Sequence, residues 1–293
     1  MTVINITGCR MFEDEIIDTL CNDPGIDEIM VFQNDECAGI VEKLVKAGLP
    51  HRVMSVDKIK RAYRSVSMDS YVVTINIMGL ELHGDPRSLK DQVYENVKHI
   101  SYFSDGIFLF YGLCGNVLKK IEKDLEQLTC PVSILKDNDG KIVDDCIGAV
   151  IGGRKSFLKM TASFNRKSAL VMTPMWARNW KEMFKHCGFI ENTDDIDMAK
   201  FVLDSMGYET VVTINTGTSY TEGAQEEMEK FADLFRLNIL EVQGNRDLIK
   251  DSYADFREMV MSHHSISRVA IGASQGILSE QQATIVPETI RTS

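Results

Sequence analysis

Three cysteines lie at positions that suit metal binding or nucleophilic chemistry as well as packing. Cys9 directly follows an expected strand, Cys114 lies where a strand ends and a helix begins, and Cys146 lies at the start of an expected helix. In an open α/β fold such positions gather at one edge of the sheet, where binding sites form. The positive end of a helix dipole favours the thiolate, which is the form that ligates metals and acts as a nucleophile.

The residues beside these thiols support a binding role. Gly112 and Gly115 flank Cys114, and glycines let the backbone approach a ligand closely. Asn116 closes the same segment, and Asp145 directly precedes Cys146. We therefore expect Gly112, Gly115, Asn116 and Asp145 to contribute to cofactor binding.

The spacing of the cysteines excludes a zinc ribbon, because no CxxC pair is present. A metal site would have to be assembled from distant segments. Three thiolates suit an iron–sulfur cluster with one open iron, or another soft metal. The alternative is that these thiols are simply buried, as free cysteines often are. Cys37, at the start of a helix, is a further candidate ligand, whereas Cys21, Cys130 and Cys187 fit a packing role.

Two polar loops could bind a small anionic ligand. One carries His83 and Arg87 ahead of a helix, although Asp85 and Pro86 between them are equally typical of a helix start. The other, Thr216–Gly223, contains Thr218 and Ser219 and could hold an anion through hydroxyls and backbone N–H groups. It lacks the lysine of a P-loop, which argues against a nucleotide.

The elements that must position these residues alternate along the chain. Short runs rich in Val and Ile predict strands: Val3–Thr7, Ile29–Gln33, Tyr71–Met78, Gly106–Tyr111, Val132–Leu135, Ala169–Thr173, Thr210–Asn215, Leu237–Val242 and Arg268–Ile271. Helical periodicity predicts helices between them: Phe12–Leu20, Ile40–Val45, Leu89–Ile100, Val117–Leu128, Met175–His186, Ala199–Met206 and Ala224–Phe235. This alternation predicts an α/β fold with parallel sheets flanked by helices.

A faint repeat suggests how these elements are organised. An Ile-Asn pair near the end of a strand recurs at Ile4–Gly8, Ile75–Gly79 and Ile214–Gly217. If it reflects duplication, two or three similar α/β units would surround a central site. A polar stretch near residue 189 suggests an N-terminal region of residues 1–188, which carries the cysteine motifs, and a C-terminal region of residues 189–293.

Composition sets the broad limits. The 293 residues include 32 Lys and Arg against 43 Asp and Glu, a net charge of −11, which argues against a nucleic-acid-binding protein. We find no signal peptide and no long apolar run, so we expect neither secretion nor a membrane span. An odd number of cysteines, seven, indicates reduced thiols and a cytoplasmic protein.

The cysteine segments resemble one particular family. Tyr111–Asn116 after an apolar strand and Asp145–Ile147 about thirty residues later look like the motifs of domain-of-unknown-function family 1638 (DUF1638), and Cys9 and Thr173–Trp176 also fit its layout. Where that family favours a Leu-His pair, this chain has Glu36 and Cys37. Members occur in methanogens and anaerobic bacteria, often beside genes for corrinoid-dependent methyltransferases. The resemblance therefore implies a role near methyl-group metabolism and supplies no reaction.

Three functions follow as hypotheses. The first is a protein that binds an iron–sulfur cluster or other thiolate-bound metal through Cys9, Cys114 and Cys146 and acts in corrinoid-dependent methyl-group metabolism of the methylamine type. The second is a non-catalytic partner of a corrinoid protein or methyltransferase. The third is an enzyme that acts on a small anionic substrate through His83, Arg87 and the Thr216–Gly223 loop.

Overall fold

The first 150 residues form a parallel sheet. The computed structural model describes residues 1–63, 66–67, 69–164, 168–218 and 220–262. Six strands pair in the order β3-β2-β4-β1-β5-β6, and every pair is parallel. Their bounds are β1 (Thr2–Cys9), β2 (Glu28–Phe32), β3 (His51–Met54), β4 (Tyr71–Met78), β5 (Gly106–Phe110) and β6 (Val132–Ile134). The α/β class predicted from the sequence is confirmed.

Helices and short 3-10 turns connect these strands. They are η1 (Arg10–Phe12), α1 (Glu13–Cys21), α2 (Cys37–Lys46), α3 (Val56–Ala62), η3 (Leu80–Gly84), α4 (Pro86–Ser101), α5 (Ile121–Asp124) and α6 (Cys146–Val150). Asp85 caps α4 by accepting the N–H of Arg87 at 3.0 Å, with Pro86 as the first helical residue. The capping role considered for this loop is therefore present in the structure.

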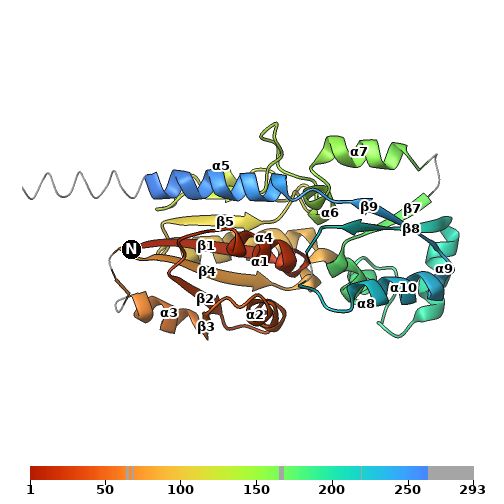
Figure 1. Cartoon of the computed structure of the whole chain (residues 1–293), viewed down its shortest axis with the longest axis horizontal. Helices are drawn as coiled ribbons and strands as arrows, with labels where there is room; N and C mark the ends of the chain where they lie inside the picture. The colour runs from red at the N-terminus through yellow and green to blue at the C-terminus, as the bar shows by residue number, and fades with distance from the viewer. Residues whose placement is uncertain (64–65, 68, 165–167, 219, 263–293) are drawn as a thin grey trace, which may run out of the picture.

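A second, smaller parallel sheet lies beside the first (Figure 1). Its order is β7-β8-β9, and α8, α9 and α10 pack with it. The bounds are α7 (Arg154–Ala162), β7 (Ser168–Met172), α8 (Pro174–His186), α9 (Ile196–Ser205), β8 (Tyr208–Asn215), α10 (Ala224–Phe235) and β9 (Asn238–Gln243). The expected division between residues 188 and 189 falls between α8 and α9, so it passes through the group of helices that covers this sheet.

The last described helix, residues 247–262, returns to the first sheet, where Figure 1 shows it as the long blue helix. The rings of Tyr253 and Phe256 lie 5.4 and 5.3 Å from that of Phe108 in β5. Most buried hydrophobic residues form one cluster between the six-stranded sheet and the helices around it. A second cluster, around Trp180 and Phe184, lies between the smaller sheet and its helices. This helix, which follows β9 of the smaller sheet, thus brings the chain back onto β5 of the first sheet.

Eight of the nine predicted strands are present, and Arg268–Ile271 lies outside the described residues. The helix predicted at Val117–Leu128 is wrong over most of its length, because only α5 is helical there. Leu118, Ile121 and Leu125 are nevertheless buried, so a chain of turns satisfies the same apolar spacing. The short strand β3 was not predicted; its side chains are half-buried or exposed at the edge of the sheet, so it lacks a continuous apolar run.

The Ile-Asn repeat has a local explanation. Its first two copies, in β1 and β4, lie side by side in one sheet, where Asn5 pairs with Thr74. The Asn5 amide donates to the Thr74 hydroxyl at 2.9 Å, and Asn76 donates to Asn96 at 2.9 Å. Buried polar groups need such partners. The described residues form two sheets, so the first two copies of the repeat belong to one unit rather than to two, and their asparagines bridge neighbouring elements.

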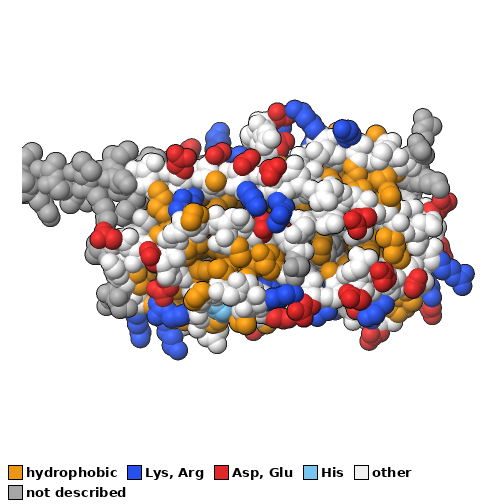
Figure 2. Space-filling model, viewed as in Figure 1, with side chains coloured by type: hydrophobic (Ala, Val, Ile, Leu, Met, Phe, Trp, Pro, Cys, Tyr) orange, Lys and Arg blue, Asp and Glu red, His pale blue; other side chains and the backbone are white. Residues whose placement is uncertain are grey.

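The surface carries charges of both signs. On the face drawn in Figure 2, acidic and basic side chains are interspersed and surround apolar areas. Within the described residues, no helix has the length and apolar character needed to cross a membrane.

Candidate functional site: a cavity lined by cysteines

The site lies at the carboxyl ends of three adjacent central strands, β4, β1 and β5. Cys9 is the last residue of β1, and its register partner Met78 is the last residue of β4. β4 leads through Gly79 into η3, which carries His83, and β5 leads into the segment that holds Cys114. Parallel strands end at one edge of a sheet, so these side chains meet there although they are far apart in sequence.

All three predicted cysteines line one cavity of about 260 Å³ at this edge. Its wall is mostly apolar, with Phe12, Leu82, Leu89, Ile147 and Met183 among the lining residues. Cys9, Cys114 and Cys146 share the cavity with His83, Asp145, Trp176 and Cys187. The structure therefore brings the three thiols together, and it adds donors that the sequence analysis had not grouped with them. No set of three or more His, Cys, Asp or Glu in the described part of the chain is already spaced to enclose a metal ion.

Gly112 explains why the two cysteine segments lie side by side. A Cβ atom at this position would lie 2.7 Å from the Val143 carbonyl oxygen and 2.8 Å from the Asp145 backbone. The absence of a side chain lets the segments pair, and the Leu113 N–H donates to the Val143 carbonyl at 2.8 Å. This close contact carries Cys114 and Cys146 into the same cavity.

Cys114 lies in an unusual stretch of backbone. Cys114, Gly115 and Asn116 have φ angles of 43°, 75° and 66°, so three consecutive residues adopt left-handed conformations. That conformation costs a non-glycine residue about 1–3 kcal/mol, and such strain is concentrated at functional sites. Asn116 is exposed and does not line the cavity, so its contribution is to tolerate the left-handed conformation.

Cys9 faces an imidazole whose tautomer is defined by a hydrogen bond. Its Sγ lies 3.9 Å from Nε2 of His83, while Nδ1 of His83 lies 3.2 Å from the Leu80 carbonyl oxygen. A carbonyl accepts only, so Nδ1 carries the proton and the Nε2 lone pair points towards the thiol. Burial lowers the pKa of His83 despite this bond, which keeps the imidazole neutral at neutral pH. Metal-binding histidines have the same arrangement, with one nitrogen free and the other anchored.

The thiols are protonated at neutral pH. Burial raises the pKa of Cys9 and Cys146 well above the usual range and that of Cys114 to about 11. Negative charge on neighbouring thiols adds to the increase for Cys9 and Cys146. Desolvation therefore outweighs the favourable helix start expected for Cys146, whose helix α6 has only five residues. A bound cation would offset both effects, because it favours the thiolate.

Two buried donors near the thiols lack ordinary hydrogen-bond partners among the described residues. The Tyr111 hydroxyl is fully buried, and its pKa is raised by burial and by the nearby Cys9 and Cys114. The Trp176 indole N–H is also buried without a well-formed bond, although it is close enough to Cys146 to lower the pKa of that thiol. Buried polar groups without partners are rare. Trp176 lines the cavity and the Tyr111 hydroxyl lies close to Cys9 and Cys114, so both donors suit a sulfur-rich group bound to these thiols.

Asp145 has a structural contact in addition to its place in the cavity. Its carboxylate caps α6 by accepting the Gly148 N–H at 2.7 Å, and burial raises its pKa. Cys187, which we assigned to packing, lines the cavity because α8 crosses the edge of the sheet. Cys37 does not line the cavity and packs against the main core from the start of α2.

The residues predicted to bind an anion are not brought together. His83 belongs to the thiol cavity, whereas Arg87 is exposed at the start of α4 and does not line it. Thr218 lines a different cavity beside β8 and shares a hydrogen bond of 2.8 Å with Thr216. Ser219 lies outside the described residues. The proposed combination of His83, Arg87 and the Thr216–Gly223 loop therefore does not form one site within the described chain.

The fold and the site define an α/β protein with a cysteine-lined cavity at the carboxyl edge of its central strands. The chain belongs to the family described as "Protein of unknown function (DUF1638)", whose model matches residues 77–253, more than half of the chain. This confirms the family predicted from the cysteine motifs. The matched region contains His83, Cys114 and Cys146 and begins after Cys9. A comparison with curated proteins finds no match.

Proposed function

We propose that this protein binds a thiolate-bound metal centre, an iron–sulfur cluster in the first place, through Cys9, Cys114 and Cys146. The observation that carries the proposal is the convergence of three thiols from separate segments on one apolar cavity. Soft thiolate ligands select iron–sulfur clusters and soft metals, and an apolar wall protects such a centre from water. Three protein thiolates leave a coordination position for His83 or for a substrate.

The chemistry of the chain's own residues follows from their protonation. Because the thiols are protonated in the metal-free protein, binding has to release a proton from each ligand. The sulfurs also have to approach one another, since the described residues hold no ready-made metal-binding group. Tyr111 and Trp176 would then donate to the sulfurs, and such hydrogen bonds tune the reduction potential of a cluster.

The experiment is anaerobic reconstitution of the full chain with ferrous iron and sulfide, followed by iron and sulfide analysis and visible absorption. We expect a coloured, loaded protein, and we expect Cys9→Ser, Cys114→Ser and Cys146→Ser each to lose most of the bound iron. Cys130→Ser is the matched control, because Cys130 is buried but lies outside this cavity. A protein that stays colourless, or a Cys114→Ser variant that retains as much iron as Cys130→Ser, contradicts the proposal.

The place of this centre in corrinoid-dependent methyl-group metabolism is the second part of the proposal, and its support is the family resemblance. A corrinoid protein or a methyltransferase would be the partner. Size-exclusion chromatography of the loaded protein with a corrinoid protein from the same host tests this role. Elution of the two proteins as separate peaks, with the metal centre intact, contradicts the partnership and leaves the metal site standing.

A further inference from the structure

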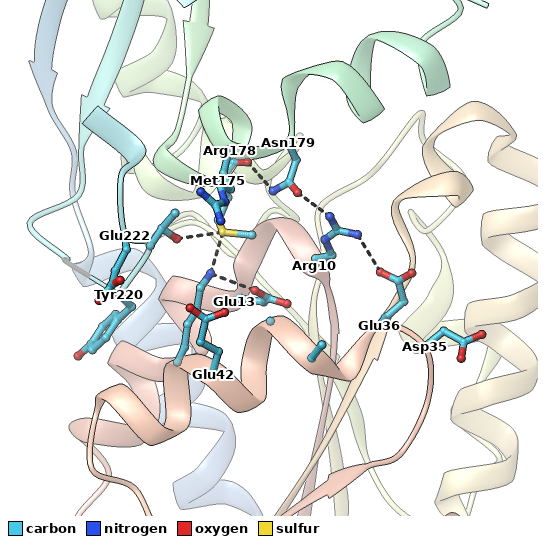
Figure 3. Close-up of a pocket in the computed structure, with 14 residues that line it drawn as sticks. Arg10, Glu13, Asp35, Glu36, Glu42, Met175, Arg178, Asn179, Tyr220 and Glu222 are labelled. Carbon is cyan, nitrogen blue, oxygen red and sulfur yellow. Dashed lines mark hydrogen bonds and ion pairs between the residues drawn. The ribbon is translucent and has the colours of Figure 1, made fainter. Parts of the chain in front are cut away.

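A second cavity, of about 310 Å³, opens beside the thiol cavity at the same edge of the sheet and has a different chemistry (Figure 3). Charged and polar side chains from η1, α1, α2 and α8 line it, together with the segment of residues 220–222. The cations are Arg10, Lys43 and Arg178. The hydrogen bonds and ion pairs within it show which charges are satisfied and which are not.

Most charges in the cavity already have partners. Lys43 bridges Glu13 and Asp14, with its Nζ 3.0 Å from one carboxylate and 2.8 Å from the other. The Thr221 hydroxyl donates to Asp14 at 2.8 Å. Arg10 forms ion pairs with Glu36 at 3.3 Å and with Glu182 at 3.2 Å. One ammonium group therefore serves two buried carboxylates, which leaves a negative charge only partly compensated.

The uncompensated atom is on Glu13. Its side chain is 2% exposed, and its Oε1 has no hydrogen-bond partner among the described residues. A Cβ atom at Gly39 would lie 2.6 Å from this oxygen, so a glycine in α2 leaves the space that the carboxylate occupies. Glu13 lines the cavity, and a small shift of its side chain would let this buried oxygen accept a hydrogen bond from a cation that carries N–H donors.

The group that could bind the opposite charge of a ligand is the guanidinium of Arg178. Arg178 is an exposed residue of α8 at the rim of the same cavity, and it makes no ion pair or hydrogen bond within the described part of the chain. Its guanidinium is a fork of donors that matches a carboxylate. Figure 3 shows Arg178 and Glu13 on different elements around the cavity, with Met175 between them. The Lys43 ammonium lies 2.8 Å from the Met175 sulfur.

We infer that this cavity binds a small zwitterion, with its ammonium group on Glu13 and its carboxylate on Arg178, an amino acid being the simplest such molecule. Within the described chain, a buried carboxylate oxygen without a donor and an exposed guanidinium without an acceptor, on two residues that line one cavity, are the two halves of such a site. A simple anion would leave Glu13 without a donor, and a quaternary amine has no N–H to give it. The site is independent of any metal in the neighbouring cavity.

The test uses the metal-free full chain and the common L-amino acids at millimolar concentration, with thermal shift as a screen and calorimetry for affinity. We expect at least one of them to raise the melting temperature by several degrees. Its N-acetyl derivative, which lacks the ammonium group, and its amide, which lacks the carboxylate, should both fail to bind. Stabilisation by an N-acetyl derivative as large as that by the parent amino acid overturns the inference, as does a panel without any stabilising member.

Two variants locate the ligand. Glu13→Gln and Arg178→Met should each weaken binding about tenfold or more, as loss of a charge-assisted hydrogen bond does. The control for the first is Glu15→Gln, which changes a buried carboxyl two residues away that does not line the cavity. The control for the second is Arg154→Met, an exposed arginine on α7. Unchanged affinity in both site variants, with the fold intact by circular dichroism, overturns the assignment.

Discussion

The two cavities share two elements and differ in nearly everything else. Cys9, at the residue before η1, and Phe12 face the thiol cavity, whereas Arg10 faces the charged one. On α8 the positions differ in the same way, with Trp176 towards the thiols and Met175 towards the charges. Neighbouring helical residues point about 100° apart, so one helix can serve both cavities. Residues that are adjacent in the sequence therefore line two cavities of different chemistry at the same edge of the sheet.

The difference lies in how each cavity treats charge. The thiol cavity keeps its thiols and its imidazole neutral, because burial raises the pKa of the thiols and lowers that of His83. The charged cavity pairs its charges, as Lys43 does with Glu13 and Asp14. Burial raises the pKa of Glu13 as well, and the Lys43 ammonium opposes that rise. A neutral apolar cavity suits a soft centre that displaces protons, and a charged one suits a hydrated polar ligand. Removal of a single polar group should therefore lower the free energy of unfolding at the charged cavity, and leave it unchanged or raise it at the thiol cavity.

The largest effect is expected for Lys43→Met. This change leaves Glu13 and Asp14 buried without their ammonium partner, and removal of one member of a buried ion pair costs about 3–5 kcal/mol. Urea unfolding at pH 7 measures the loss. At lower pH the loss should shrink, because protonated carboxyls no longer need the cation. Lys230→Met, at an exposed pair with Glu227, is the control and should cost about 0–1 kcal/mol. Equal losses in the two variants would show that the charges do not form a buried network.

The next effect concerns the geometry of the thiol cavity. In Gly112→Ala a methyl group meets the Val143 carbonyl at 2.7 Å, so the two cysteine segments must separate. Overpacking of this kind costs about 1–3 kcal/mol of stability. We also expect the variant to bind less iron on reconstitution. Gly148→Ala is the control, because its nearest contact is the Asp145 carboxylate at 3.4 Å and it lies within α6. If Gly112→Ala retains full iron content, close pairing of the segments is not needed for the site.

A third prediction concerns the neutral state of the thiols. The pKa of Cys114 is raised from 9.0 to about 11, which lowers its thiolate fraction at neutral pH about 100-fold. Iodoacetamide should label Cys114 of the metal-free protein correspondingly more slowly than a free cysteine, with a rate that rises with pH until about pH 11. Peptide mass spectrometry over time measures this. Labelling of Cys114 at the rate of a free cysteine would mean that the thiol is solvated and ionised.

Part of this arrangement is visible in the sequence. Strand ends could be read from apolar runs, so the meeting of Cys9, Cys114 and Cys146 at one sheet edge was predictable from the parallel topology. Cys187 was not predictable, because the path of α8 across that edge depends on the packing of the second sheet. The anchored tautomer of His83 depends on the Leu80 carbonyl and is likewise tertiary.

The residues of the charged cavity were even less predictable from the sequence. Its partners Glu13, Lys43 and Arg178 come from three helices, and nothing in their spacing indicates that they face one another. The α1 pattern does contain a signal, since Glu13, Asp14 and Glu15 are consecutive acids that all become buried. Acids at a helix start are usually explained by the dipole and by solvent exposure. Burial distinguishes a paired charge from a surface charge, and burial is a property of the fold.

The smallest effect should come from Tyr111→Phe. The Tyr111 hydroxyl is buried without a partner in the described chain, so its removal from the metal-free protein should leave stability unchanged or raise it by up to about 1 kcal/mol. Tyr253→Phe is the matched comparison, because its hydroxyl bonds Tyr71 at 2.9 Å and Asp23 at 3.3 Å and its loss should destabilise by about 1 kcal/mol. Urea unfolding of both metal-free variants shows whether each substitution raises or lowers the free energy of unfolding.

In the loaded protein the Tyr111 hydroxyl acquires a role if sulfur becomes its acceptor. A hydrogen bond to a cluster sulfur stabilises the more negative, reduced state, so Tyr111→Phe should lower the midpoint potential while iron content stays the same. Tyr253→Phe should leave the potential unchanged, since Tyr253 packs against β5 from the last described helix and does not line the cavity. If Tyr111→Phe destabilises the metal-free protein as much as Tyr253→Phe does, the Tyr111 hydroxyl already has a hydrogen-bond partner in that state. The hydroxyl would then need no bound group as its acceptor.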